Sequence, residues 1–215
     1  MIYLISDIHS NPDFPGLKKY LSEAKEDDLL IVLGDTELNF EKTEENKFFT
    51  EEFLKSNKKI AIVDGNHDNF EYLNSFPEEV WHGGTVGRLN DNIVFLKRGN
   101  SYKIDGMSFF VFGGCKSSPK WKEKGLWFDG EEPSEEQIKL AYETIKNNNF
   151  SFDYILTHKY ESELTHGTPC QKLRDLISYI EENVRYKAWY SGHWHRYEKT
   201  DRKHYIVYDE LIKAE

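Results

Sequence analysis

Five short polar clusters recur along the sequence, and each contains side chains that can bind a metal ion. The clusters are Asp7-Ile8-His9, Gly34-Asp35, Gly65-Asn66-His67-Asp68, Thr157-His158 and Gly192-His193-Trp194-His195. Imidazole nitrogens, carboxylate oxygens and amide oxygens form a donor set suited to borderline divalent metals such as manganese, iron, cobalt, nickel and zinc. Together the clusters contain five of the eight histidines, so they predict one metal site rather than five unrelated turns.

A short apolar segment precedes every cluster, which predicts a buried strand in each case. The segments are Ile2–Ile5, Leu29–Leu33, Ile60–Val63, Tyr154–Thr157 and Ala188–Ser191. Polar residues hardly interrupt them, as is typical of strands that are covered on both faces. Helical spacing of apolar residues over 17–24 and 48–54 predicts βαβ units with parallel strands. Because ligands bind at the carboxyl ends of such strands, we expect the five clusters to meet at one edge.

The rest of the chain predicts further elements of the same domain. Short strands joined by tight turns are expected between residues 80 and 112, and they indicate a second, more antiparallel sheet. Residues 113–133 show no periodic pattern and predict a long irregular loop. Helices are predicted from Ser134, as the cap, to about Asn147 and over 173–180, and a closing strand over 205–208. No linker or repeat interrupts the chain, so we expect a single domain over residues 1–215.

Composition limits the classes of partner. The chain has 38 acidic and 28 basic residues and a net charge of −10, which argues against an extended nucleic acid as the partner. No apolar run approaches the roughly 18 residues of a membrane span, and the first residues lack the pattern of a signal peptide. Cys115 and Cys170 have no Cys-x-x-Cys spacing, which fits a reducing compartment. We therefore expect a cytoplasmic protein with no membrane partner.

In their order along the chain, the clusters resemble the motifs of the calcineurin-like metallophosphoesterase superfamily. The resemblance implies an α/β fold in four layers, an αββα sandwich of two mixed β-sheets flanked by helices. It also implies a centre of two divalent metal ions, with manganese placed before iron, nickel, cobalt or zinc. The implied ligands are Asp7, His9 and His195 for the first ion, Asn66, His158 and His193 for the second, and Asp35 as the bridge. In this pattern His67 is a catalytic residue that Asp68 orients.

The reaction implied by the resemblance is the hydrolysis of a phosphate ester, a monoester or a diester, in a small phosphorylated substrate. A hydroxide that bridges the two ions would attack the phosphorus, and His67 would donate a proton to the leaving oxygen. Two alternatives stay open: a nuclease of the superfamily, which would need a basic or dimeric surface, and a non-catalytic scaffold that binds proteins. The presence of His67 and of every implied ligand favours the enzyme.

The sequence also departs from part of the superfamily. Thr36-Glu37-Leu38 follows Gly34-Asp35, whereas the protein serine/threonine phosphatase branch has Gly-Asp-x-Val-Asp-Arg-Gly, so the arginine that grips phosphate in that branch is missing. The opening Ser-Asp-Ile-His-Ser-Asn is closer to the small bacterial phosphoesterases, and parts of residues 113–134 resemble compact bacterial or phage members.

Some residues near these motifs are left outside the predicted site. Trp121 and Trp127 are expected to pin the loop over 113–133 to the body of the protein rather than to stack on a substrate base. Arg88 and Arg98 could clamp a phosphate, but nothing in their spacing ties them to the five clusters.

Overall fold

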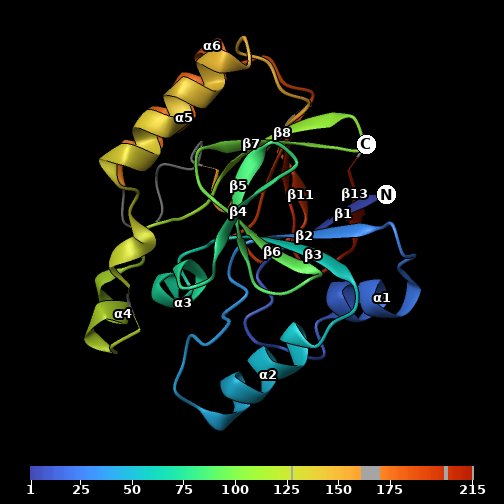
Figure 1. Ribbon diagram of the computed structural model, residues 1–215. Helices are drawn as coiled ribbons and strands as arrows, with labels where there is room; N and C mark the ends of the chain where they lie inside the picture. The colour runs from blue at the N-terminus through green and yellow to red at the C-terminus, as the bar shows by residue number, and fades with distance from the viewer. Residues whose placement is uncertain (127, 161–169, 201–202, 215) are drawn as a thin grey trace.

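Two β-sheets lie face to face in the computed structural model, which describes residues 1–126, 128–160, 170–200 and 203–214 (Figure 1). Over these residues, the first sheet has the strand order β13-β1-β2-β3-β6-β5-β4 and the second has the order β11-β12-β10-β9-β8-β7. The first contains β1 (Ile2–Ile5), β2 (Leu29–Leu33), β3 (Lys59–Val63), β4 (Glu78–Trp81), β5 (Gly84–Arg88), β6 (Ile93–Leu96) and β13 (Ile212–Lys213). The second contains β7 (Asn100–Ile104), β8 (Met107–Phe112), β9 (Tyr154–Thr157), β10 (Ala188–Ser191), β11 (Glu198–Lys199) and β12 (His204–Ile206).

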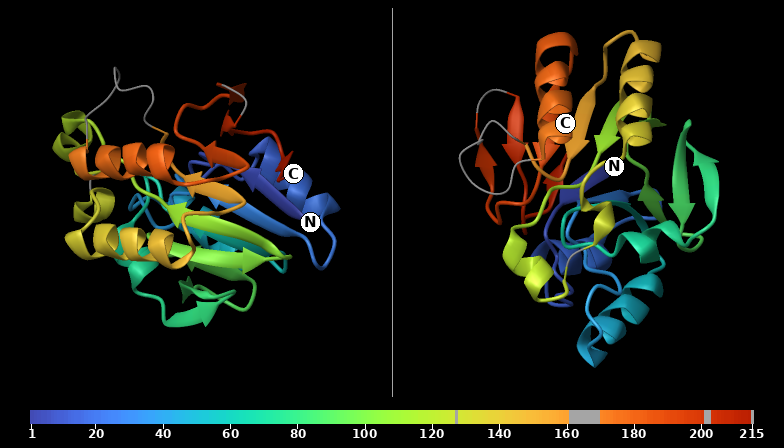
Figure 2. Two further views of the ribbon diagram at one scale, coloured as in Figure 1. Left: turned by 90° about the horizontal axis from the view of Figure 1, so that it is seen from above. Right: turned by 90° about the vertical axis from the view of Figure 1, so that its left-hand side faces the viewer.

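Helices cover the outer face of each sheet. The helices and the short 3-10 turn are α1 (Pro15–Glu23), α2 (Glu44–Leu54), α3 (Phe70–Asn74), α4 (Pro119–Glu123), η1 (Asp129–Glu131), α5 (Glu135–Asn147) and α6 (Gln171–Asn183). Figure 2 shows α5 and α6 side by side over the second sheet, while α1 and α2 lie on the opposite side of the molecule. Ser134 caps α5 as expected, in a reciprocal pair with Gln137. The predicted four-layer sandwich of two mixed sheets between helices is therefore confirmed.

The apolar strands bury side chains on both faces. Leu4 and Ile31 from the first sheet and Leu156 and Tyr190 from the second belong to one core between the sheets. Leu30, like the other residues on the outer face of β2, instead packs in the core beneath α1 and α2. Since both faces are covered, the alternation of polar and apolar residues that marks a half-exposed strand is absent from these segments.

Residues 80–112 do not form a second antiparallel sheet of their own, and this expectation was wrong. Strands β4, β5 and β6 extend the first sheet, where β6 pairs in parallel with β3 through Ile60 and Ile93. Strands β7 and β8 lie at the edge of the second sheet as an antiparallel pair, and β8, β9, β10 and β12 are parallel to one another there. Local pattern does not specify which sheet a strand joins, because the partner residues are far away in the sequence.

The irregular segment expected over 113–133 contains two short helical turns, α4 and η1. The other predicted helices and strands begin and end within a few residues of the expected positions, whereas α3, β11 and β13 were not predicted. No helix in the described ranges is both long and apolar enough to cross a membrane.

Candidate metal centre

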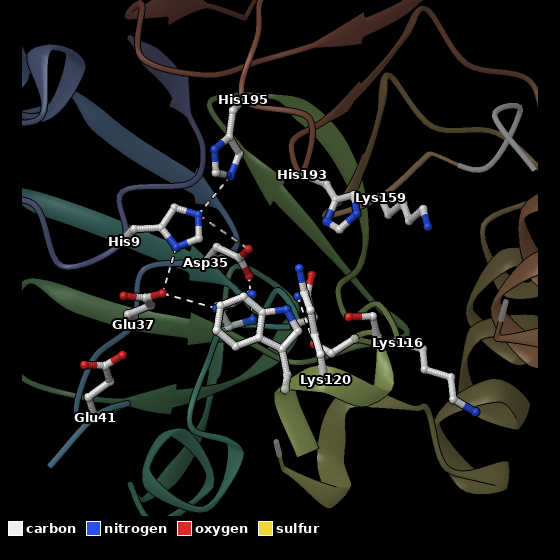
Figure 3. A pocket seen from close by; sticks show the side chains of 14 residues that line it. His9, Asp35, Glu37, Glu41, Lys116, Lys120, Lys159, His193 and His195 are labelled. Carbon is white, nitrogen blue, oxygen red and sulfur yellow. Dashed lines mark hydrogen bonds and ion pairs between the residues drawn. The ribbon is translucent and has the colours of Figure 1, made fainter. Parts of the chain in front are cut away.

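The side chains at the ends of β1 and β10 form one group of potential metal ligands. Ligand atoms of Asp7, His9 and His195 all lie within 4.8 Å of one another. The Nε2 atom of His195 is 3.4 Å from Asp7 Oδ1 and 2.9 Å from His9 Nε2. In Figure 3 the two imidazole rings point toward each other across the cavity. The three residues expected to bind the first ion are therefore together.

A second group lies next to the first, and its carboxylate is close to a histidine of the first group. Asp35, His158 and His193 again have ligand atoms within 4.8 Å of one another. The Nε2 atom of His158 is 3.4 Å from Asp35 Oδ2, 3.3 Å from His193 Nδ1 and 3.2 Å from Asn66 Oδ1. Asp35 Oδ2 is also 3.8 Å from His9 Nε2, so this oxygen lies between the two groups.

The backbone at these positions is unusual. The φ angle is 60° at Asp7, 49° at His9, 55° at Asp35, 73° at His193 and 49° at His195. Residues other than glycine rarely adopt this left-handed conformation, which costs on the order of 1–3 kcal/mol and persists only where the surroundings impose it. Five strained residues in one cluster indicate that the turns after the strands are shaped for function rather than for stability.

Two glycines let these turns approach one another. Gly34 has a φ of 96°, and a Cβ at this position would overlap with the ring of His158. A Cβ at Gly192 would overlap with the hydroxyl of Ser6 and crowd the carboxylate of Asp7. Larger residues here would push the ligand side chains apart.

The arrangement of donors around His158 fits a cation. The Nδ1 atom of this buried ring is 2.7 Å from the carbonyl oxygen of Leu33, so Nδ1 must carry the hydrogen. In the neutral imidazole, Nε2 then presents a lone pair to the oxygens of Asp35 and Asn66. Lone pairs that face one another in a buried site repel unless a positive charge lies between them. The residues present therefore suit a divalent metal ion.

The two predicted catalytic residues, His67 and Asp68, do not interact as expected. The carboxylate of Asp68 is buried and accepts hydrogen bonds from the backbone N–H groups of Asp35, Thr36, Glu37 and Gly65, at 2.7–3.0 Å. Its two oxygens thus hold the turn that carries Asp35. Burial and the nearby Asp35 charge raise the pKa of Asp68 to about 7, against the effect of the backbone donors.

The carboxylate next to the ring of His67 belongs to Glu37, whose Oε1 is 3.3 Å from His67 Nδ1. The structure therefore places the carboxylate of Glu37, rather than that of Asp68, beside the ring of His67. Glu37 Oε1 is also 2.7 Å from Nδ1 of His9, so one carboxylate links a potential metal ligand to His67. In the sequence, Glu37 stands out only as part of a departure from a motif. Its position two residues after Asp35 is the one signal that could have identified it.

Comparison with known proteins identifies the family of this chain. A family model described as calcineurin-like phosphoesterase matches residues 1–197. The chain belongs to this family. No curated protein matches it. One solved structure is 14% identical over 97% of this chain and 90% of its own, with a TM-score of 0.48. A protein of unknown function from Aquifex aeolicus is 15% identical over 86% of this chain and 87% of its own, with a TM-score of 0.39.

Members of the calcineurin-like phosphoesterase family bind divalent metal ions. The pKa values of the candidate ligand histidines indicate which of them carry a proton when no ion is bound. Burial alone would lower the pKa of His158, but the Asp35 carboxylate raises it to about 10. Burial likewise opposes protonation of His9, whose hydrogen bond with Glu37 and neighbouring carboxylates raise its pKa to about 9. For His193, burial and the positive charge of His158 lower the pKa to about 3.

Metal binding to this protein at pH 7 is therefore expected to release about two protons, one each from His9 and His158, because metal ligands must be deprotonated. Titration calorimetry with Mn²⁺ in buffers of different ionisation enthalpy measures this number. The control variant His82→Asn, which changes a histidine outside both ligand groups, should release the same number. Binding without proton release would show that these two side chains are not ligands.

An open cavity of about 430 Å³ lies over the metal centre (Figure 3). Glu37 and Glu41 line it on the side of His9, whereas Lys116 and Lys159 line it on the side of His193. Lys120 lines the cavity as well.

Trp121 also lines this cavity, and its indole packs edge-on against His67 with 4.5 Å between the ring centres. It therefore belongs to the site as well as to the loop that it was expected to pin. Trp127 lies outside the described residues. Neither Arg88 nor Arg98 is among the residues that line the cavity: Arg88 pairs with Glu79, and Arg98 is buried against Asp64.

Proposed function

We propose that the protein is a hydrolase that cleaves phosphate esters of small substrates at a centre of two metal ions. The observation that carries this proposal is the position of Asp35 between two groups of ligands, with His67 beside them on the same cavity. Asp7, His9 and His195 would hold one ion, and Asn66, His158 and His193 the other, with Asp35 shared.

Two divalent ions bound there, manganese first among the candidates, would neutralise phosphoryl charge and lower the pKa of a water molecule toward neutrality. The chain itself supplies the proton that the leaving oxygen needs when its bond to phosphorus breaks. Glu37 engages Nδ1 of His67, which leaves Nε2 as the donor of this proton. A histidine suits this role because its ordinary pKa lies near neutrality.

The cavity supports a small anionic substrate rather than a nucleic acid polymer. Lys116, Lys120 and Lys159 line it, but Glu132 already pairs with Lys116 at 2.8 Å. The chain as a whole carries a net charge of −10, and no extended basic surface follows from its composition. A cytoplasmic location is part of the same proposal and fits the two buried thiols of Cys115 and Cys170.

The proposal is tested with p-nitrophenyl phosphate and bis(p-nitrophenyl) phosphate, which distinguish monoester from diester hydrolysis. We expect protein loaded with Mn²⁺ to hydrolyse at least one of them and EDTA to abolish the activity. A panel of nucleotides, cyclic nucleotides, sugar phosphates and phosphopeptides then identifies the class of natural substrate. A sample that contains two ions per chain and is inert toward every member of the panel would refute the enzyme and favour the scaffold.

A further inference from the structure

The segment between β8 and α5 contacts one of the proposed metal ligands directly. Ser117 in this segment is buried, and its Oγ is 3.0 Å from the amide nitrogen of Asn66. The amide oxygen of Asn66 points the other way, to Nε2 of His158 at 3.2 Å. Only the oxygen of an amide can bind a cation. Whatever contacts the nitrogen therefore decides whether Asn66 can serve as a ligand.

A serine hydroxyl does not make this choice by itself, since it can donate or accept. Here Glu131 decides. Its Oε2 accepts the backbone N–H of Ser117 at 2.7 Å, which places a carboxylate oxygen close to the Ser117 side chain. The single hydroxyl hydrogen is then directed to Glu131, and the lone pairs of Oγ face the NH₂ group of Asn66.

The orientation of the Ser117 hydroxyl between Glu131 and Asn66 does not depend on the charge of Glu131. Burial raises the pKa of the Glu131 carboxyl to about 7, although hydrogen bonds from Ser117 oppose the shift. A bound proton would lie on Oε1, which has no hydrogen-bond partner in the part of the chain that the structure describes. Oε2 therefore remains an acceptor with the carboxyl neutral or ionised.

Buried contacts hold both ends of the segment in place. Arg98 donates from Nε to Asp64 Oδ2 at 2.7 Å and from Nη2 to the carbonyl oxygen of Glu131 at 3.4 Å. The N–H of Gly114 donates to the carbonyl oxygen of Asp64 at 2.8 Å, so the start of the segment is attached to the same residue. Asp64 stands just before the turn that carries Asn66. Both the segment that carries Ser117 and Glu131 and the turn that carries Asn66 are thus attached at Asp64.

We propose that Ser117 is a positioning residue that keeps the amide oxygen of Asn66 turned toward the second metal ion, and that Glu131 gives Ser117 its direction. This inference rests on the proposed function only in taking Asn66 as a ligand. It gives the long segment after β8 a role in metal binding, in addition to lining the cavity.

Binding of Mn²⁺ alone, measured by titration calorimetry, tests the inference without reference to activity. Ser117→Ala is expected to weaken the binding of the second Mn²⁺ ion by about 10–100-fold, which is the usual effect of removing a hydrogen-bond partner of a metal ligand. The affinity for the first ion should not change. Ser118→Ala is the matched control, because the neighbouring hydroxyl is buried without a partner among the described residues. Its Mn²⁺ affinities should equal those of the unmodified protein.

A double-mutant cycle with Asn66→Asp separates orientation from loop stability. A carboxylate presents an oxygen in either orientation, so Ser117→Ala should cause almost no further loss in the Asn66→Asp background. An equal loss in both backgrounds would mean that Ser117 only supports the loop, and the inference would be wrong. Glu131→Met should behave as Ser117→Ala does, whereas Glu131→Gln, which keeps an accepting oxygen, should restore the affinity.

The outcome also separates this inference from the proposed function. An unmodified protein that binds no Mn²⁺ contradicts both. If the unmodified protein binds two ions and Ser117→Ala binds them equally well, only the positioning role is overturned. Thermal unfolding of each variant without metal shows whether a lost affinity comes from a lost fold.

Discussion

Asp35→Asn is expected to remove both metal ions from the protein at once. The Oδ2 atom of Asp35 lies 3.4 Å from His158 Nε2 and 3.8 Å from His9 Nε2, so one oxygen faces both ligand groups. The amide introduced by the substitution would direct its NH₂ group there, because Oδ1 has to keep accepting the N–H of His67 at 2.7 Å. Each ion should bind more than about 100-fold more weakly, since loss of an outer partner alone costs up to that much.

The substitution preserves size and one hydrogen bond, so the fold should survive it. Metal analysis after dialysis against micromolar Mn²⁺ is the measurement, with hydrolysis of p-nitrophenyl phosphate as a second readout. Asp13→Asn removes a carboxylate that pairs only with Lys18 on the surface, and it should keep the full metal content. If the Asp35→Asn protein still holds two ions per chain, Asp35 does not bridge them.

The sequence predicted that the implied ligands lie close together, because their placement follows from simple geometry, whereas their roles came from the resemblance. Each lies directly after a short apolar strand, and parallel strands bring their carboxyl ends to a common edge. Nothing further is needed to predict that Asp7, Asp35 and His158 are close. The same reasoning predicted the helices on both sides, since strands without polar faces must be covered on both faces.

What the sequence could not predict depends on contacts between residues far apart in the chain. The resemblance assigned Asp68 to His67, but the oxygens of Asp68 accept hydrogen bonds from backbone groups of the turn after β2. Glu37 takes its place only because a left-handed backbone, with a φ of 62°, turns its side chain toward His67. Ser117 is likewise recognised as part of the site only once Asn66 lies beside it.

His67→Ala is expected to slow the hydrolysis of alkyl phosphates by about 10²–10⁴-fold, the usual contribution of a general acid. An alkoxide is a poor leaving group and needs the proton that His67 would donate. With p-nitrophenyl phosphate the loss should be much smaller, because p-nitrophenolate leaves without a proton. The measurement is kcat for both substrates, with His82→Ala as the control.

Metal content decides what a loss of activity in His67→Ala means. His67, His9 and Glu37 also have atoms within 4.8 Å of one another, so this trio could in principle hold an ion. If His67 is the proton donor, the variant should keep two ions per chain and lose more activity on alkyl phosphates than on p-nitrophenyl phosphate. Equal losses on both substrates, together with a missing ion, would instead make His67 a ligand. Equal losses with both ions in place would show that His67 positions the substrate and donates no proton.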